Sequence, residues 1–394
     1  MGCRRRAEPF TIRSLPQHHV FLVPGFFGFL SFGEMTYFSA VAELLEHRLV
    51  ELGLDARVQA VGTLPTASLR ARAAALARAV ASAHVPPEAH IHFVGHSSGG
   101  LDVRLMTAPG VVLPIDFDLE ALARRVRTVV TLATPHYGTP LASVATGVLG
   151  QKLLQLLSVL TLYALRFGRR PLRGAVRAAQ ILVRLDDMVG LGDSILDQLY
   201  AQVLSDFSKE RSQSLETFLG HVRGDQALLP QITPDSLDLF NSSTRDRADV
   251  RYGCVVTRAR PPKVLGTFAV GLDPTAQLSH AIYHALYRLT AQMAPGRLPA
   301  LTDAQVEALV SGYGKVPAPS ANDGMVPTLS QVWGRVIHIA RADHLDVMGY
   351  FGDPSRGPTH VDWLVTRSGF DRTRFRAVWG AVARTIAESA RRPS

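Results

Sequence analysis

Apolar residues alternate along the chain between short runs and longer segments with helical spacing. His18 to Val23 (HHVFLV) is a short apolar run that ends at Pro24-Gly25, which predicts a strand that enters a glycine-containing loop. Apolar residues with helical spacing run from Glu34 to Leu54 and predict a helix, and a second strand is predicted over Ala56 to Val61. Leu69 to His84 is rich in alanine and arginine and has the helical period again. The first part of the chain is therefore expected to form two strands and two helices in alternation.

Further short apolar runs continue this alternation. They predict strands over His90 to Val94, Val126 to Leu132, Val250 to Thr257 and Arg335 to Ala340. Helices between successive strands are typical of a parallel sheet, because each connection has to cross from one end of the sheet to the other. The pattern predicts an α/β fold with a doubly wound, mostly parallel sheet.

The alternation stops between Pro140 and Asp246, where only helical candidates follow one another. We therefore expect one domain over residues 1–394 with a helical lid inserted over residues 141–245. Its most apolar stretch, Leu153 to Leu165, is shorter than the roughly 20 apolar residues that span a bilayer, so a buried or interfacial helix is expected.

Composition narrows the class of protein. The sequence has 47% hydrophobic and 19% charged residues, and this composition excludes a disordered chain. The sequence has no internal period, so a repeat protein is not expected. The net charge is +9, and only four of the 42 basic residues are lysine. A basic surface attracts anionic membranes or nucleic acid, but no nucleic-acid-binding motif accompanies it. GC-rich coding with a solvated basic surface explains the charge equally well.

Basic residues cluster directly after the apolar stretch of the lid. They are Arg166, Arg169, Arg170, Arg173 and Arg177. The cluster is suited to transient contact with lipid head groups, and a solvated basic turn is the alternative. The N-terminal residues lack the apolar run of a signal peptide, so a cytoplasmic or peripherally membrane-bound protein is expected.

The strongest local motif is Gly95-His96-Ser97-Ser98-Gly99, which follows the strand HIHFV and precedes a predicted helix. A G-x-S-x-G sequence at a strand-to-helix turn presents a nucleophilic serine, because glycines on both sides leave room for a cramped turn. This context is typical of the α/β-hydrolase fold, with Ser97 as the nucleophile. Acyl transfer also needs donors for the developing oxyanion. The backbone N–H groups of Ser98 and Phe26 are the candidates.

The loop that carries Phe26 follows the first strand. Gly25 allows its backbone to come close to a substrate, and the rings of Phe26, Phe27 and Phe29 are suited to line an acyl pocket. An ordinary turn with aromatic rings packed into the core is the alternative.

A nucleophilic serine needs a base, and the base needs an orienting carboxylate. In this fold they follow the serine in the order acid, then histidine. Asn322-Asp323-Gly324 is a turn sequence that would project the carboxylate of Asp323. His344 comes directly after the last predicted strand, where the base belongs. His360 also follows that strand and is the rival.

Five ordered segments carry a resemblance to a known family. The segments are FLVPGFFGF, VGHSSGGLDVR, ATPHYGTPLA, NDGMV and DHLDV, and they span about residues 20–350. Together they resemble the bacterial true lipases of the Pseudomonas and Burkholderia type. The resemblance implies Ser97 as nucleophile, Asp323 as acid and His344 as base, with the N–H groups of Phe26 and Ser98 as the oxyanion hole. Pro24 and Ser98 depart from the family's usual residues, but neither removes a needed N–H group.

The resemblance also implies a structural calcium ion that braces the histidine loop. By position, its two carboxylate ligands would be Asp303 and Asp346. Carboxylates and carbonyl oxygens are the ligands that Ca²⁺ prefers. Asp303 also opens a helix-like stretch, where a first-turn carboxylate is the alternative role.

The expected enzyme is a lipase or carboxylesterase that cleaves esters with apolar acyl chains and needs no organic cofactor. Its partners are ester or lipid substrates, without nucleic acid. Thioester hydrolysis, polyester depolymerisation and acyl transfer to an alcohol use the same triad. A noncatalytic binding protein on a hydrolase scaffold is the rival from another class, and the complete set of candidate catalytic residues argues against it.

Overall fold

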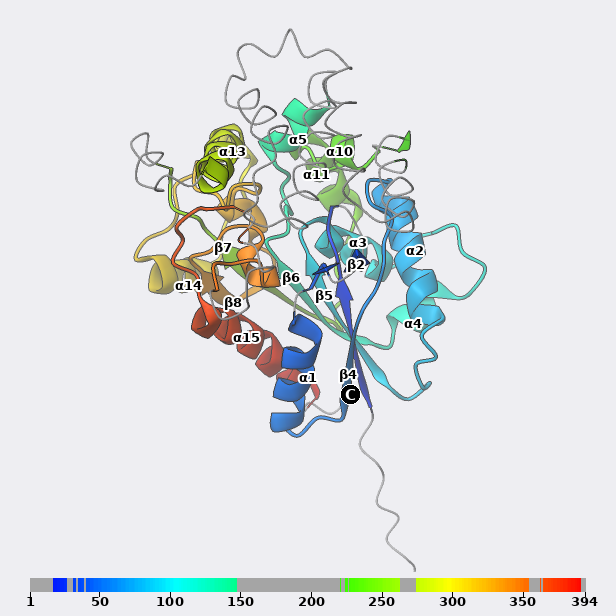
Figure 1. The fold of residues 1–394 in the computed structure, drawn as a ribbon. Helices are drawn as coiled ribbons and strands as arrows, with labels where there is room; N and C mark the ends of the chain where they lie inside the picture. The colour runs from blue at the N-terminus through cyan, green and yellow to red at the C-terminus, as the bar shows by residue number, and fades with distance from the viewer. Residues whose placement is uncertain are drawn as a thin grey trace, which may run out of the picture.

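A parallel sheet of six strands forms the centre of the protein in the computed structural model (Figure 1). The structure describes residues 17–26, 31–32, 35–38, 40–146, 220, 224–225, 227–262, 274–353, 362 and 364–390. In spatial order the strands are β4 (Ala56–Ala60), β1 (His18–Val23), β5 (His90–His96), β6 (Val126–Leu132), β7 (Arg251–Thr257) and β8 (Arg335–Ala340). Every neighbouring pair is parallel.

Helices cover both faces of this sheet. The helices α1 (Val41–Glu51) and α15 (Arg372–Ala390) share a core with Val20, Leu22 and Val94. On the other face, α2 (Leu69–Ala81) and α3 (Ser98–Thr107) pack with Phe21, Val23 and Phe93. The central strands are apolar without alternation because side chains on both of their faces are buried.

The remaining described elements are short or peripheral. The strands β2 (Ser31–Phe32) and β3 (Met35–Thr36) pair with each other. The other helices are α4 (Leu119–Ala123), α5 (Pro140–Ala145), α10 (Leu228–Gln231), α11 (Pro234–Ser243), α13 (Pro274–Thr290) and α14 (Asp303–Tyr313). Single 3-10 turns occur at Pro295–Arg297, Thr328–Gln331 and Asp346–Met348. Among the helices of the described residues, none has the length and apolarity that crossing a bilayer requires.

The α/β fold with a doubly wound parallel sheet is confirmed, and the six predicted strands are all present. One helix boundary was wrong. The helix predicted from Glu34 begins at Val41, because Met35 and Thr36 pair with the preceding β2 strand instead. Pairing between strands overrides a helical spacing of apolar residues at such a boundary.

The order of the strands shows where a site is expected. From β1 the chain moves to β4 on one side, and it then returns to β5 on the other side. Ligands bind in such sheets outside the carboxyl ends of strands where the winding reverses. Gly25 follows β1 and Ser97 follows β5, so the two candidate loops meet at this point.

The ends of the predicted lid lie beyond the carboxyl ends of the strands. There the described segments α5, α10 and α11 are helical (Figure 1). Residues 147–219, with the apolar stretch and the arginine cluster, lie outside the described residues. The lid over residues 141–245 therefore stays a prediction.

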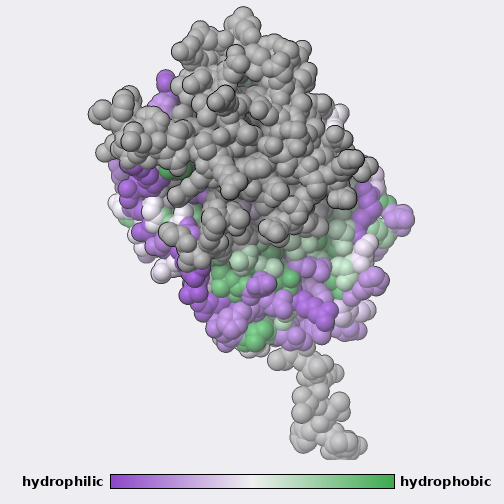
Figure 2. Space-filling view, in the orientation of Figure 1, coloured by the Kyte–Doolittle hydropathy of each residue, from purple (hydrophilic) through white to green (hydrophobic). Residues whose placement is uncertain are grey.

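On the described surface, hydrophobic areas are bordered by hydrophilic residues in the view of Figure 2. Large hydrophobic side chains that are exposed occur at separate places along the chain, namely at Val50, Leu64, Val112, Val144, Leu239, Val310 and Val316. Scattered exposure of this kind is normal for a protein in water and identifies no docking surface.

Candidate active site

Ser97 lies on a sharp turn between β5 and α3. Its φ of 53° and ψ of −133° are unusual for a residue with a side chain. Strain of this kind is common at functional positions. A Cβ atom on Gly95 would lie 2.6 Å from the backbone nitrogen of Gly100, and one on Gly99 would lie 2.4 Å from the carbonyl oxygen of Val23. The two glycines of the motif are therefore needed for backbone to pack closely around the serine.

The loop after β1 packs directly against this serine. We call Pro24 to Phe26 the oxyanion loop, after the role that the sequence predicts for Phe26. A Cβ atom on Gly25 would lie 2.5 Å from Ser97 Cβ and 3.1 Å from Ser97 Oγ, so only glycine fits there. Phe26 is half-buried and packs against the small core that includes Leu101 and Leu228. Phe27 and Phe29, the other predicted pocket residues, lie outside the described residues.

The structure brings Asp323 and His344 together. His344 Nδ1 lies 2.9 Å from Asp323 Oδ2, and the N–H of His344 donates to the carbonyl oxygen of Asp323 at 3.1 Å. Both residues are buried. Because the carboxylate accepts from Nδ1–H, Nε2 is the nitrogen that a neutral His344 ring would use as a base.

Asp323 is itself held by several donors. Its Oδ1 accepts hydrogen bonds from the N–H groups of Met325 and Val326 at 3.0 and 2.8 Å. Its Oδ2 accepts from the Thr257 hydroxyl at 2.7 Å and from Gln331 Nε2 at 3.2 Å. These contacts fix the carboxylate as an acceptor that faces the histidine.

His344 lies beside the residue that precedes the nucleophile. The rings of His96 and His344 have centroids 4.7 Å apart, and His96 Nε2 lies 2.9 Å from the carbonyl oxygen of His344. Ser97, Asp323 and His344 therefore belong to one region at the carboxyl ends of β5, β7 and β8. The rival base, His360, lies outside the described residues.

Sequence reasoning missed Arg72, a buried arginine of α2. It donates to both oxygens of Asp102 at 2.7 to 3.1 Å, and its Nη2 also donates to the carbonyl oxygens of Pro24 and Gly25 at 3.2 Å. Arg72 thus holds the oxyanion loop by its carbonyl groups. Nothing in the sequence distinguished it from the other arginines of its helix, because the contacts are made across the fold.

Asp102 and Arg104, two positions apart on α3, each form an ion pair with a different element. Asp102 pairs with Arg72, while Arg104 Nε lies 3.6 Å from Asp246 and its guanidinium lies over the Trp333 ring. The two residues are separated by two positions on a helix, which places their side chains on different faces.

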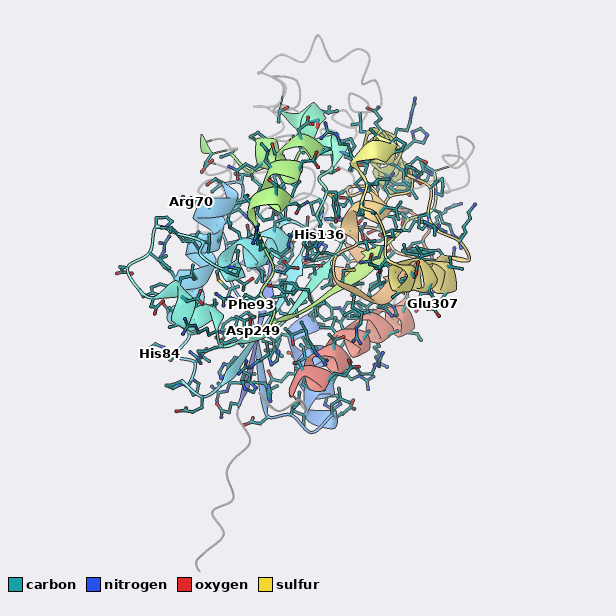
Figure 3. All side chains as sticks on the ribbon, turned by 180° about the vertical axis from the view of Figure 1, so that it is seen from behind. Arg70, His84, Phe93, His136, Asp249 and Glu307 are labelled. Atoms are coloured by element: carbon teal, nitrogen blue, oxygen red, sulfur yellow. The ribbon has the colours of Figure 1, made fainter. Side chains whose placement is uncertain are left out.

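His136 supports the loop after β6. Arg104 Nη1 lies 3.2 Å from its Nδ1, and Thr131 Oγ1 lies 3.0 Å from its Nε2. Figure 3 shows His136 inside the molecule, whereas Arg70, His84 and Glu307 lie at its periphery. With both ring nitrogens in contact with these partners, His136 is not available as a base.

The two predicted calcium ligands are not brought together. Asp303 is exposed in the first turn of α14, near the amino end of β8, where Gln305 Nε2 donates to the carbonyl oxygen of Gly334. Asp346 is buried beyond the carboxyl end of the same strand. Spacing along the chain does not show at which end of a strand a residue lies, so the pairing of Asp303 with Asp346 was wrong.

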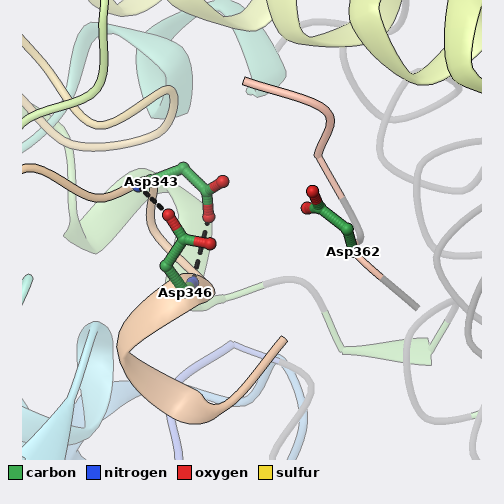
Figure 4. A group of neighbouring side chains, drawn as sticks. All are labelled: Asp343, Asp346 and Asp362. Carbon is green, nitrogen blue, oxygen red and sulfur yellow. Dashed lines mark hydrogen bonds between the residues drawn. The ribbon is translucent and has the colours of Figure 1, made fainter. Parts of the chain in front are cut away.

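Asp346 instead lies in a group of three aspartates (Figure 4). One ligand atom each of Asp343, Asp346 and Asp362 lies within 4.8 Å of the others. The N–H of Asp343 donates to Asp346 Oδ2 at 2.8 Å, and the N–H of Asp346 donates to Asp343 Oδ1 at 3.0 Å. Burial raises the pKa of both Asp343 and Asp346; repulsion from Asp323 adds to the shift of Asp343, and repulsion from Asp343 and Asp362 adds to that of Asp346. Such a donor set fits a hard divalent cation.

Comparison with known proteins returns similar folds at low sequence identity. The sequence matches no protein-family model, and no curated protein matches it. Staphylococcus hyicus lipase is 14% identical with a TM-score of 0.49, over 98% of each chain. Lipase 1 from Pelosinus fermentans is 16% identical with a TM-score of 0.48, over 95% of this chain and 99% of that one.

A metagenomic carboxyl esterase is 18% identical with a TM-score of 0.46, over 97% of this chain and 79% of that one. These structural neighbours are two lipases and a carboxyl esterase. The Pseudomonas and Burkholderia type of lipase is not confirmed. The chemistry of this chain is therefore inferred from its own side chains.

Proposed function

We propose that this chain is a serine hydrolase that cleaves carboxylic esters with apolar acyl chains, as a triacylglycerol lipase or carboxylesterase. One observation carries the proposal. Ser97 sits on a strained turn against the backbone of Gly25, and the hydrogen-bonded pair of His344 and Asp323 lies alongside the residue before it. This set contains a nucleophile, a base and an orienting carboxylate in the order typical of the fold.

The reaction would proceed in two steps on Ser97. His344 Nε2 takes the hydroxyl proton as Ser97 Oγ forms a bond to the ester carbonyl carbon, and the carbonyl oxygen becomes an oxyanion. Collapse breaks the bond to the alcohol oxygen, which leaves with the proton from His344. Water then attacks the acyl-enzyme with the same histidine as base, and the acid leaves. Asp323 orients the imidazole throughout.

The oxyanion would be bound by the N–H groups of Phe26 and Ser98. Ser98 is the first residue of α3, where N–H groups point outward and the helix dipole favours negative charge. Phe26 follows Gly25, whose backbone packs against the serine. The departures at Pro24 and Ser98 from the Pseudomonas and Burkholderia lipases leave these N–H groups in place, so they are compatible with that type of lipase.

A calcium ion is proposed at Asp343, Asp346 and Asp362. When bound, it would neutralise three neighbouring carboxylates and brace the loop that carries His344, which lies directly after Asp343. It would take no part in the chemical steps. We propose further that the lid over residues 141–245 contacts lipid interfaces through its apolar stretch and arginine cluster.

Hydrolysis of p-nitrophenyl esters from acetate to palmitate tests the function. Wild type should hydrolyse them, and Ser97→Ala should lose at least about 1000-fold in kcat while its melting temperature stays near that of wild type. An optimum at long chains would indicate a lipase, and one at short chains a carboxylesterase. Substantial activity in Ser97→Ala would refute the nucleophile assignment. Thioesters, polyesters and an acceptor alcohol in the same panel would reveal another acyl-group reaction.

A further inference from the structure

Three hydrogen bonds in series link the two loops that flank Ser97. The N–H of Gly25 donates to the Tyr37 hydroxyl oxygen at 2.9 Å. That oxygen lies 2.8 Å from His96 Nδ1, and His96 Nε2 lies 2.9 Å from the carbonyl oxygen of His344. Two side chains that the proposed mechanism does not use therefore connect the oxyanion loop with the backbone of the candidate base.

The direction of each hydrogen bond follows from the chemistry of the last acceptor. A carbonyl oxygen only accepts, so His96 Nε2 must carry a hydrogen. Burial, with a further contribution from His344, holds the pKa of His96 well below its usual value, and the ring is neutral at pH 7. Its Nδ1 therefore accepts from the Tyr37 hydroxyl, whose oxygen accepts in turn from Gly25.

The surroundings of the two side chains make these bonds costly to lose. His96 is fully buried and Tyr37 is 8% exposed, so water cannot readily replace a missing partner. The Tyr37 ring packs in the core that includes α1 and α15, and it contacts the Phe38 ring with centroids 5.1 Å apart. The hydroxyl is therefore held in place by packing as well as by its hydrogen bonds.

We propose that Tyr37 and His96 are positioning residues for ester hydrolysis, which hold the oxyanion loop and the His344 backbone at a fixed distance across Ser97. This inference rests on the proposed function. One connected group of hydrogen bonds then positions both the oxyanion hole and the base. Arg72 donates to the carbonyl oxygens of Pro24 and Gly25 in the oxyanion loop, and Tyr37 accepts from the N–H group of Gly25 in the same loop.

The variant Tyr37→Phe tests the role with the change of a single oxygen. It leaves the Gly25 N–H and His96 Nδ1 without their partner, so the loop can relax away from the reacting oxygen. We expect kcat for p-nitrophenyl butyrate to fall about 10-fold to 100-fold, with KM changed by less than about 3-fold. The inhibition constant of an alkyl trifluoromethyl ketone, which forms a tetrahedral adduct with a serine, should rise by about the same factor as kcat/KM falls.

Tyr252→Phe is the matched control. The Tyr252 hydroxyl also accepts a backbone N–H, from Arg247 at 3.2 Å, but near the amino end of β7. Both variants should lose some thermal stability, and only Tyr37→Phe should lose kcat and affinity for the ketone. A purely structural role would lower the fraction of folded protein in both variants and leave the inhibition constant unchanged. Equal kcat in the two variants, with an active wild type, would overturn the proposal.

Nitrogen NMR of the His96 ring gives a readout that does not depend on catalysis. Wild type should show neutral His96 with its hydrogen on Nε2 from pH 6 to pH 8, assigned by comparison with His96→Gln. A hydrogen on Nδ1, or a cationic ring at pH 7, would overturn the hydrogen-bonded series. Lack of ester hydrolysis in wild type would contradict the proposed function instead, so the two failures are distinguishable.

Discussion

At the scale of single residues, close backbone contact around Ser97 is the feature on which the candidate site depends. Gly25, Gly95 and Gly99 each lie where a Cβ atom would come within 2.6 Å of another atom. Backbone therefore packs closely around the nucleophile at these three positions. Backbone N–H groups in such surroundings are suitable donors to a reacting carbonyl oxygen.

Gly25→Ala tests that contact directly. Its added methyl group would lie 2.5 Å from Ser97 Cβ and 2.8 Å from the carbonyl oxygen of His96, so the oxyanion loop must move. We expect kcat/KM for p-nitrophenyl butyrate to fall by about 100-fold or more, as for loss of an oxyanion-hole donor. Gly296→Ala is the control, because nothing lies within 4 Å of the added atom. Similar activity in both variants would show that the loop does not need this close approach.

At the scale of elements, the amino ends of β1 and β5 carry a buried pair of histidines far from the candidate site. His18 Nδ1 lies 3.0 Å from His92 Nε2, and both residues are buried. Burial first, and His90 second, lower the pKa of His18 to about 4, and burial with His18 lowers that of His92. Both rings are therefore neutral in the folded protein at pH 7, and one donates to the other.

This pair predicts a loss of stability in acid. The unfolded chain takes up protons on these histidines below about pH 6.5, whereas folded His18 does so only near pH 4. Stability is therefore complete above pH 6.5 and falls as the pH decreases toward 4. From pH 7 to pH 5 the free energy of unfolding should fall by about 2 kcal/mol for His18 alone.

Urea unfolding at pH 7 and pH 5 measures this dependence. His18→Gln should show a smaller decrease than wild type, by about 2 kcal/mol, because the titrating ring is gone. His84→Asn, which replaces an exposed histidine, should behave as wild type. An unchanged decrease in His18→Gln would mean that His18 titrates normally in the folded protein.

The loop after β8 is a second element whose stability can be tested. If Asp343, Asp346 and Asp362 bind calcium, chelation with EGTA should lower the melting temperature by several degrees, and added Ca²⁺ should restore it. Asp346→Asn should lose this response, while Asp303→Asn should keep it, because Asp303 lies near the other end of β8. A melting temperature that does not respond to chelation or to added Ca²⁺ would refute the metal site. Loss of the response in Asp303→Asn would show that Asp303 takes part in binding the ion.

At the scale of the whole molecule, the sheet and the candidate triad could be predicted from the sequence because both depend on short local sequence patterns. Each strand is a short apolar run, Ser97 and His344 come shortly after strands, and Asp323 lies in a recognisable Asn-Asp-Gly turn between α14 and β8. The order of these turns then places them at the same edge of a parallel sheet.

Contacts made across the fold could not be predicted in this way. Tyr37 and His96 are 59 positions apart, and His96 and His344 are 248 apart. Arg72 looks like any arginine of a helix until the fold shows that it is buried against Asp102. Asp303 was assigned to the wrong group because sequence spacing does not reveal which end of a strand faces a loop. The candidate catalytic residues can therefore be predicted from the sequence, whereas the residues that hold them in place cannot.

The central claim is that Ser97 forms a covalent acyl-enzyme. Reaction with a short-chain p-nitrophenyl phosphonate tests it most directly, since a phosphonate bonds to an activated serine and releases p-nitrophenol once. We predict one label per chain, located at Ser97 by peptide mass spectrometry, and no label in Ser97→Ala. Labelling of another residue, or an unlabelled protein that still hydrolyses esters, would contradict the account.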